Sequence, residues 1–394
     1  MKQWKTLSPV MAYLFFAYAT LMIITSYMPV YYQSQGLTAA QIGWLLAIGP
    51  FASIFAQPIW GFLSDKYKTI KNVLLVAIIG AVLISFILFQ MSSFIGFLVL
   101  VFFLFLFVPP LTALGDSLAQ KTSAQHNVSF GQLRMWGSIG FGVCSLAIGY
   151  LLSIIGIGYL MYPFWFLAAI LFITALFLKD VKTTNKPVTL LGALKLRKNK
   201  RLLFFLTVIM LVSIGHRTND SFLGIYITSL GGDESLIGWA WFAGVATETV
   251  ILATSALWFR RFQAITFITI AAGLYTIRWI LMGQLTEPSH ILWFQLFHGI
   301  TFGVFYLCAF QYVTKLIPEE LQATGHVLFI TIFFGVSGII GSLFGGWVIE
   351  SYSHSLLYFC LGGTSFIGMV GLIVYKVLID KKDKEIKAQT EAAM

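Results

Sequence analysis

The sequence predicts an all-α polytopic membrane protein in which twelve transmembrane helices form two six-helix bundles related by pseudo-two-fold symmetry. Three observations lead to this prediction: the composition, twelve apolar stretches of membrane-spanning length, and an internal repeat. Of the 394 residues, 58% are hydrophobic and only 10% are charged, and the mean hydropathy is +0.87. These values lie far outside the range of soluble globular domains.

Each apolar stretch contains about 20 residues, the length that a helix needs to cross the hydrocarbon core of a bilayer. The first stretch follows a basic start, but it is too long for the core of a signal peptide and further spans follow, so we interpret it as an uncleaved first helix. Almost no sequence remains for a soluble domain. In order, the predicted spans are 9–32, 39–63, 72–90, 94–119, 130–154, 158–178, 202–230, 235–258, 264–283, 289–314, 321–349 and 356–375.

The net charge of +10 would suit a nucleic-acid-binding protein, but the distribution of the basic residues argues against such a partner. Three of the 25 Lys and Arg residues lie within predicted spans. All the others lie in the tails or in every second loop, such as Lys66 after the second span and Arg260 after the eighth. This distribution obeys the positive-inside rule, so we expect a multi-pass protein of the cell (plasma) membrane with cytoplasmic N- and C-termini.

The sequence offers no chemistry for an enzyme or a channel. It contains no H-E-x-x-H zinc motif, no P-loop, no plausible set of Ser, His and Asp and no selectivity-filter segment. The three cysteines, Cys144, Cys308 and Cys360, lie in apolar spans and are expected to pack there as small residues. We therefore expect no enzymatic activity, no metal and no cofactor.

The two halves of the chain share a repeat at an offset of 195 residues. The segment 31–49, "YYQSQGLTAAQIGWLLAIG", aligns with 226–244, "YITSLGGDESLIGWAWFAG", so that the first two spans match the seventh and eighth. A glycine-rich fifth span is echoed by a glycine-rich eleventh, and small residues let helices pack closely. The identical pairs are Tyr31/Tyr226, Ser34/Ser229, Gly36/Gly231, Ile42/Ile237, Gly43/Gly238, Trp44/Trp239 and Gly49/Gly244.

A long, polar and strongly basic segment at 179–201 separates the halves and is interpreted as a cytoplasmic linker. The predicted domains are an N-terminal six-helix bundle at 1–178, this linker, and a C-terminal six-helix bundle with a short cytoplasmic tail at 202–394. Two parallel six-helix halves around a site near the bilayer midplane are a plan of secondary transporters.

Ionisable side chains within the predicted spans are candidate functional residues, because placing such a group in a membrane is costly. Asp116 and Arg134 lie equally far from the loop between their spans, so antiparallel helices bring them to one depth, where they can pair. Arg217 and Glu248 straddle the loop between the seventh and eighth spans in the same way, near mid-bilayer. Asp220 follows Arg217 by three residues, on nearly the same helix face.

Arg278 and His298 are also equidistant from the loop between their spans, so the C-terminal half presents a cation and a titratable imidazole at one level. Structural roles stay open at this stage. Arg134 can snorkel to the cytoplasmic surface, Arg217 and Glu248 can form a purely structural pair, and His298 can be a hydrogen-bonded interior residue. Taken together, three cations and three carboxylates indicate a balanced polar cavity that water can reach.

The segment "GFLSDKYKTIK" after the second span resembles a loop motif of the major facilitator superfamily. It matches G-x-L-x-D-[RK]-x-G-[RK]-[RK] at Gly61, Leu63, Asp65 and Lys66, and it departs from the motif at Lys68. The resemblance implies the twelve-helix fold of that superfamily. It also implies a conformational latch in which Gly61, Asp65 and Lys66 help to hold the cytoplasmic side shut.

Most of the chain resembles the lactose permease and phenylpropionate permease branch of that superfamily. Asp116 precedes Arg134 by 18 residues, and "FGQLRMWGSIGF" is similar to the helix-five segment F/Y-G-x-x-R-[ML]-[FW]-G of the branch. The resemblance implies that Asp116 and Arg134 hold substrate, with Trp136 and Phe141 offering aromatic surface. Phe141 stands where the lactose permease has a Trp that stacks on the sugar.

Further segments resemble helices eight, nine and ten of the branch. "RWILMG" and "LFHGITF" place Arg278 and His298 20 residues apart, as in the branch, which implies that both contribute to substrate binding. Thr301 stands where the lactose permease has its proton-carrying Glu. "GVATETVILATSALWFRRF" is more similar to the phenylpropionate permeases, which share a Glu at the position of Glu248.

The resemblance implies a secondary active transporter, a permease that couples a small organic solute to the proton gradient. An aromatic carboxylate such as a phenylpropionate-like acid is the favoured substrate; a sugar, oligosaccharide or nucleoside is the alternative, and a non-transporting membrane sensor is the alternative of another class. Proton coupling is assigned to Glu248 or Asp220, with Arg217 and His298 nearby. We expect a monomer whose partners are its solute, protons and the lipid bilayer.

Overall fold

The computed structural model describes residues 4–180, 196, 199–258 and 263–392, and every regular element in these ranges is a helix. Within these ranges twelve helices are long and apolar enough to cross a membrane, which confirms the predicted fold class. The first half contains α1 (Trp4–Met22), η1 (Ile23–Tyr27), α2 (Met28–Ser34), α3 (Ala39–Tyr67), α4 (Lys71–Leu88), α5 (Phe94–His126), α6 (Phe130–Ile155), η2 (Ile157–Tyr159) and α7 (Met161–Leu176).

The second half contains α9 (Lys200–Ser229), α10 (Glu234–Ala253), α11 (Ser255–Trp258), α12 (Ala264–Met282), η4 (Pro288–His290), α13 (Ile291–Leu296), η5 (Gly299–Gly303), α14 (Val304–Leu316), η6 (Glu319–Leu321), α15 (Gln322–Ile330), η7 (Thr331–Val336), α16 (Ser337–Ser351) and α17 (His354–Ala392). Most of the predicted linker, and the basic pair Arg260 and Arg261, lie outside the described residues.

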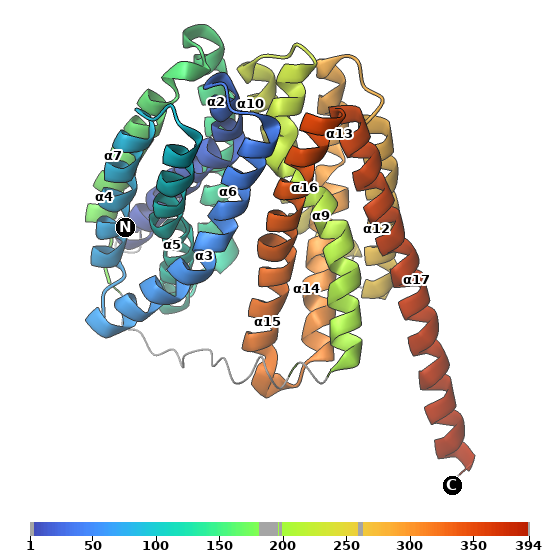
Figure 1. The fold of residues 1–394 in the computed structure, drawn as a ribbon. Helices are drawn as coiled ribbons and strands as arrows, with labels where there is room; N and C mark the ends of the chain where they lie inside the picture. The colour runs from blue at the N-terminus through green and yellow to red at the C-terminus, as the bar shows by residue number, and fades with distance from the viewer. Residues whose placement is uncertain (1–3, 181–195, 197–198, 259–262, 393–394) are drawn as a thin grey trace.

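The helices of each half pack mainly on one another. In the first half α1 packs against α5, α6 and α7, while α5 also packs against α3 and α4. In the second half α17 packs against α9 and α12, and α9 also packs against α16. Between the halves, α6 packs against α10 and α3 packs against α16. The two bundles therefore meet mainly along these two helix pairs, with smaller contacts of η1 and α2 against α9 (Figure 1).

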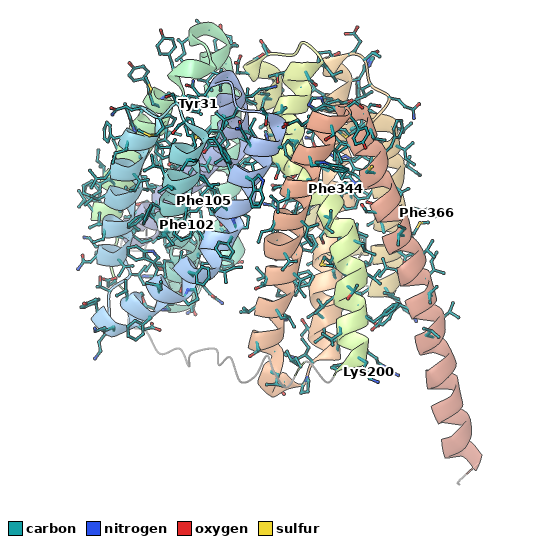
Figure 2. All side chains as sticks on the ribbon, in the orientation of Figure 1. Tyr31, Phe102, Phe105, Lys200, Phe344 and Phe366 are labelled. Carbon is teal, nitrogen blue, oxygen red and sulfur yellow. The ribbon has the colours of Figure 1, made fainter. Side chains whose placement is uncertain are left out.

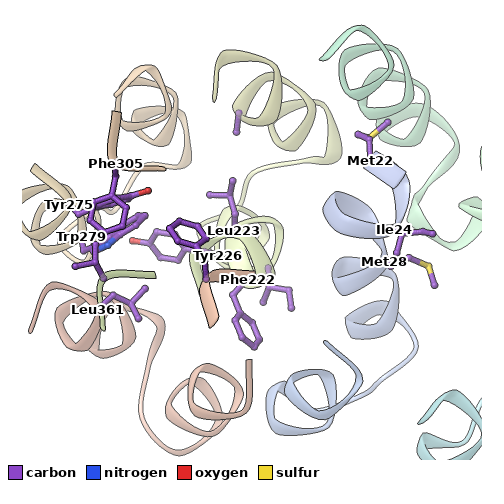
Figure 3. Close-up of a cluster of buried hydrophobic side chains, with 14 of the residues drawn as sticks. Met22, Ile24, Met28, Phe222, Leu223, Tyr226, Tyr275, Trp279, Phe305 and Leu361 are labelled. Carbon is purple, nitrogen blue, oxygen red and sulfur yellow. The ribbon is translucent and has the colours of Figure 1, made fainter. Parts of the chain in front are cut away.

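Apolar side chains fill the bundles and also cover their outer surface (Figure 2). One buried cluster includes residues of both halves, among them Met22 in the first half and Phe222 and Tyr226 on α9, close to Trp279 on α12 (Figure 3). On the outside, large apolar residues such as Phe366 are half exposed. In a twelve-span chain such an apolar exterior is the surface that faces lipid.

The internal repeat has a structural explanation at the turns. Gly36 and Gly231, which occupy equivalent positions, have φ angles of +82° and +89°, a left-handed conformation that favours glycine. Two residues later, Thr38 and Asp233 cap the helices that follow, each accepting a backbone N–H three residues ahead. The repeat therefore encodes the same turn and the same helix start in both halves.

A second repeated pair marks where the halves touch. A Cβ added to Gly43 on α3 would lie 2.5 Å from the carbonyl oxygen of Ser342 on α16, and a Cβ added to Gly238 on α10 would lie 2.3 Å from that of Ser145 on α6. Because ordinary contacts begin at 3.4 Å, only glycine permits these two crossings. Each half thus contributes the same glycine to one of the two inter-half helix pairs.

Hydrogen bonds close the same end of the molecule. The Ala40 N–H on α3 donates to the Glu350 carboxylate on α16 at 2.7 Å, and the Thr228 hydroxyl donates to the Gln33 amide oxygen at 3.2 Å. We call this the sealed end; it carries the turns at 34–38 and 229–233. Toward the opposite ends of α3 and α15 the two bundles diverge (Figure 1).

Replacing Gly238 by Leu should force the sealed end apart. Overpacking a close helix crossing costs about 1–3 kcal/mol, which shifts a two-state equilibrium by roughly 5- to 150-fold. The measurement is the spin-label distance, by double electron–electron resonance, between Gln35→Cys and Ser353→Cys in a variant lacking the three native cysteines. Gly363→Leu is the control, because an added Cβ there meets nothing within 4 Å. An unchanged distance distribution in Gly238→Leu would contradict the seal.

Candidate functional site

Three helices of the first half bring together a charged pair and a tyrosine. Arg134 Nε on α6 lies 3.3 Å from Asp116 Oδ1 on α5, and the Tyr18 hydroxyl on α1 donates to Asp116 Oδ2 at 2.7 Å. The Arg134 guanidinium also lies 3.9 Å from the centre of the Tyr18 ring, a cation–π contact. Tyr18 therefore contacts both members of the ion pair.

A glycine makes room for this arrangement. A Cβ at position 137, one turn after Arg134, would lie 2.6 Å from the Tyr18 ring and 2.9 Å from an Arg134 nitrogen. Gly140, one turn further, lets α6 approach the backbone of Phe15 on α1. The glycine-rich fifth span thus brings α1 close enough for Tyr18 to reach Arg134.

The structure contains the Asp116 and Arg134 pair that their equal depths predict. Both side chains are about 30% exposed, and Arg134 is held by Asp116 and Tyr18. Sequence reasoning missed Tyr18, because one tyrosine among the many aromatic residues of an apolar span gives no distinguishing signal. Only the packing of α1 against α6 reveals it.

The predicted pairing of Arg217 with Glu248 is wrong for the described residues. Arg217 Nη1 instead donates to Asp220 Oδ2 at 3.0 Å, because a carboxylate three residues along the same helix lies within easy reach. Glu248 Oε2 on α10 lies 3.7 Å from His298 Nε2. Spacing along the sequence offered Arg217 two carboxylates, and the structure pairs it with the one on its own helix.

A second histidine, His216, joins this group. Its Nε2 lies 3.3 Å from Asp220 Oδ2, and its ring is stacked on Phe302 with ring centres 4.4 Å apart. The centres of the His216 and His298 rings are 5.6 Å apart. His216 was missed from the sequence, although its position four residues before Asp220 was a signal that could have found it.

Arg278 is buried among neutral partners. Its Nη2 donates to Gln295 at 2.7 Å and its Nη1 to the Thr301 hydroxyl at 3.0 Å, and no carboxylate of the described residues lies within ion-pair distance. Thr301 lies in η5, a π-helical segment, and such segments often occur at functional sites. Arg278 and His298 lie at one level, as predicted, because Arg278 binds Thr301, which follows His298 by less than one turn.

The predicted aromatic residues differ in their surroundings. Trp136 is 36% exposed. Phe141 is partly buried and packs across the interface of the halves against Trp241 on α10, with ring centres 5.6 Å apart. Trp136 thus has the more exposed surface in this conformation, and the substrate-binding role of both stays a prediction.

The predicted latch residues lie at the end of α3 away from the sealed end. The Lys66 ammonium is 5.5 Å from the centre of the Tyr67 ring, and Asp65 is exposed without an ion pair to any described residue. Asp180, after α7, caps the start of α4 by accepting hydrogen bonds from the N–H groups of Ile70 and Lys71 at 2.7 and 2.9 Å. The latch role of Gly61, Asp65 and Lys66 stays a prediction.

Partly exposed charges therefore occur in both halves. Side-chain exposure is about 30% for the first-half pair, 25% for Arg217 and 26% for Glu248, but 13% for Asp220. Because a charge facing lipid is very costly, these side chains are exposed to water between the halves. Among the described residues no group of three or more His, Cys, Asp and Glu side chains is arranged to hold a metal ion.

The chain is similar to known membrane transporters. The model of the MFS_1 like family matches residues 8–360. An uncharacterized transporter of Bacillus subtilis, YwbF, is 28% identical over 89% of this chain and 88% of its own length. The maltose permease of Geobacillus stearothermophilus is 27% identical over 94% of each chain. The probable 3-phenylpropionic acid transporter of Escherichia coli is 27% identical over 87% of this chain and 90% of its own.

Solved structures share the fold. The nucleoside transporter NupG superposes with a TM-score of 0.85 over 94% of this chain and 98% of its own, at 17% sequence identity. At that level of identity the likeness shows the fold alone. The three relatives are all named as transporters, which agrees with the expectation that the chain is no enzyme.

Removing one partner of the first-half ion pair should destabilise the protein more than removing both. Asp116→Asn or Arg134→Gln alone leaves a partly buried charge unpaired, while the double variant leaves none, so we expect a coupling free energy of about 1 kcal/mol. The measurement is thermal unfolding of the four proteins in one detergent, with exposed Lys200→Gln as the control. Additive effects of the two single substitutions would show that the pair contributes no interaction energy.

Proposed function

The chain belongs to the MFS_1 like family and is a transporter of the major facilitator type, and we propose that it carries a small aromatic carboxylate together with a proton by alternating access. One observation carries the proposal. Partly exposed charged groups from both halves, Arg134 and Asp116 on one side and Arg217, Asp220 and Glu248 on the other, lie in a molecule that is closed at one end.

The conformation supports alternating access. The positive-inside rule favours cytoplasmic termini, which leaves the sealed end outside the cell. In that orientation the protein is closed to the outside and faces inward. Transport then requires the glycine crossings to separate while the opposite ends of the bundles come together, as in the rocking of two parallel six-helix halves about a central site.

Arg134 is the group best suited to bind a carboxylate. A guanidinium can donate two parallel hydrogen bonds to a carboxylate, and this one already lies beside a carboxylate and an aromatic face. A substrate carboxylate that binds Arg134 displaces the carboxylate of Asp116. Without its cationic partner, Asp116 is more stable in the site when it carries a proton. Binding of an anion and of a proton would thereby favour each other. The similarity to a probable 3-phenylpropionic acid transporter supports an aromatic acid.

A sugar or a nucleoside is the second candidate. The Asp116 and Arg134 pair offers both acceptors and donors to neighbouring hydroxyl groups, and Trp136 offers an apolar face. The maltose permease is among the relatives and a nucleoside transporter among the structures of the same fold. The aromatic acid is preferred because protonation of Asp116 or Glu248 leaves the three arginines of the spans with only two carboxylates, so the site then has one positive charge for a substrate anion.

Glu248→Gln should separate exchange from accumulation. The acid is a quarter exposed and lies against an imidazole, so it can take up and release a proton, whereas the amide cannot. We expect wild-type proteoliposomes with a pH gradient to accumulate radiolabelled 3-phenylpropionate, and the variant to exchange it without accumulating it.

The panel also contains maltose and uridine. Accumulation of either in place of the acid would identify the second candidate as the substrate class. Normal accumulation by Glu248→Gln would assign the coupling proton to Asp220. If wild type binds a member of the panel but moves none, the protein acts as a sensor and the transport proposal is wrong.

Arg134→Lys should weaken binding of an acid far more than its charge would suggest. Lysine keeps the positive charge but loses the paired hydrogen bonds and the planar stack on Tyr18, so we expect roughly 10- to 100-fold weaker inhibition of exchange by unlabelled acid. Lys200→Gln should have no effect. Competition by 3-phenylpropionamide as strong as that by the acid would contradict carboxylate recognition by Arg134.

A further inference from the structure

We propose that His216 transfers a proton between Asp220 and Glu248 by way of His298, so that the two carboxyl groups of the second half act as one coupled unit. This inference deepens the proposed function and rests on its proton coupling. It assigns a role to a buried histidine that lies between two acids on different helices.

The geometry forms a chain of four titratable groups. Asp220 Oδ2 lies 3.3 Å from His216 Nε2, the two imidazole rings lie 5.6 Å apart between centres, and His298 Nε2 lies 3.7 Å from Glu248 Oε2. The first two groups are on α9, His298 immediately precedes η5, and Glu248 is on α10. The chain therefore crosses from the seventh to the eighth span through the tenth.

The unused atoms of His216 and Asp220 fit this role. His216 is 2% exposed, and its Nδ1 has no hydrogen-bond partner in the described structure. Asp220 Oδ1 is also buried and unpartnered. Buried polar atoms normally have a hydrogen-bond partner, so these two atoms can still donate or accept one. Phe302 stacks on the face of the His216 ring, so the ring edge that carries both nitrogens stays available for proton exchange.

Groups from several helices pack around His216. Arg217 donates to Asp220 Oδ2, the oxygen that lies 3.3 Å from His216 Nε2. From α12, Tyr275 packs with its ring centre 5.9 Å from that of His216, and the buried Arg278 is held by Thr301 of η5. The uncharged ring of Phe333 of η7 also packs near His216. Asp220 and His298 are therefore the groups beside His216 that can exchange a proton with it.

The transfer conserves protons, and each link that is longer than a hydrogen bond must shorten, or be bridged by water, for its step to take place. A protonated Asp220 gives its proton to His216 Nε2, and the resulting imidazolium releases its other proton from Nδ1 to Nδ1 of His298. His298 then releases the proton on its Nε2 to Glu248. One O–H bond is broken at Asp220 and one is formed at Glu248, and each imidazole ends in its other tautomer.

Asp220 and Glu248 differ in their exposure to solvent, and this difference sets the direction of the proton transfer. Asp220 is 13% exposed and Glu248 is 26% exposed. In this conformation Glu248 is therefore the site at which a proton leaves to water, and Asp220 is the enclosed site that holds it. We expect the exposures to be reversed when the sealed end opens.

Infrared titration of the purified protein tests the coupling without any solute. The C=O bands of protonated Asp220 and Glu248 are assigned from Asp220→Asn and Glu248→Gln, and their intensities are followed with pH in reconstituted membranes. In the otherwise wild-type protein, Glu248→Gln should shift the pH at which half of Asp220 is protonated by at least about half a unit, because coupled sites titrate as a pair. The His216→Phe variant keeps a ring that can stack on Phe302. In that variant, Glu248→Gln should leave the midpoint pH of Asp220 unchanged.

Transport separates this role from a structural one. His216→Phe and His216→Gln should both lower pH-driven accumulation of 3-phenylpropionate by at least about tenfold while changing exchange by less than about threefold. A merely structural histidine would affect both processes alike. His216→Gln keeps a polar side chain, so it serves if His216→Phe unfolds.

The outcomes distinguish the relay from the proposed function. Coupled midpoints that persist in both His216 variants, or unchanged accumulation in them, overturn the relay while leaving proton-driven transport intact. Coupled midpoints that vanish without His216 support the relay even if 3-phenylpropionate is not carried, in which case only the substrate assignment fails.

Discussion

Charged groups inside a membrane need partners or water, and this constraint organises the whole molecule. A single unpaired charge in the hydrocarbon core would cost more than most packing interactions supply. The protein supplies these partners in two ways. Arg134 with Asp116, and Arg217 with Asp220, form pairs that stay partly exposed between the halves, whereas Arg278 is enclosed by neutral hydrogen-bond acceptors. The charges can therefore exist only if the bundles leave a wet space between them.

The glycine crossings set the shape of that space. They bring α3 against α16 and α10 against α6 at the backbone, so the halves are joined at one end and can diverge at the other. Side chains at these positions would hold the halves apart and remove the seal. The same close packing within the first half, at Gly137 and Gly140, allows Tyr18 to reach the charged pair. Small residues thus determine both the closure of the molecule and the local geometry of its site.

The two halves of the site differ in what they can do. The first half presents one guanidinium held by a carboxylate and a tyrosine, an arrangement suited to gripping an anion or a hydroxyl. The second half contains two carboxylates linked through two imidazoles, an arrangement suited to moving protons. Thr301 on the tenth span agrees with this division, since its hydroxyl accepts a hydrogen bond from Arg278 and does not titrate near neutral pH.

The sequence by itself determined the class of protein and the spans, because hydrophobic length and basic loops depend only on residue order. It also determined the repeat, whose Gly36 and Gly231 the turns require. Only the tertiary structure decided the partners. Spacing offered Arg217 one carboxylate on its own helix and one on the next, and the packed helices leave it with Asp220 in place of Glu248. Rotation of each helix about its axis, which sequence spacing leaves open, brought Tyr18 and His216 into the site.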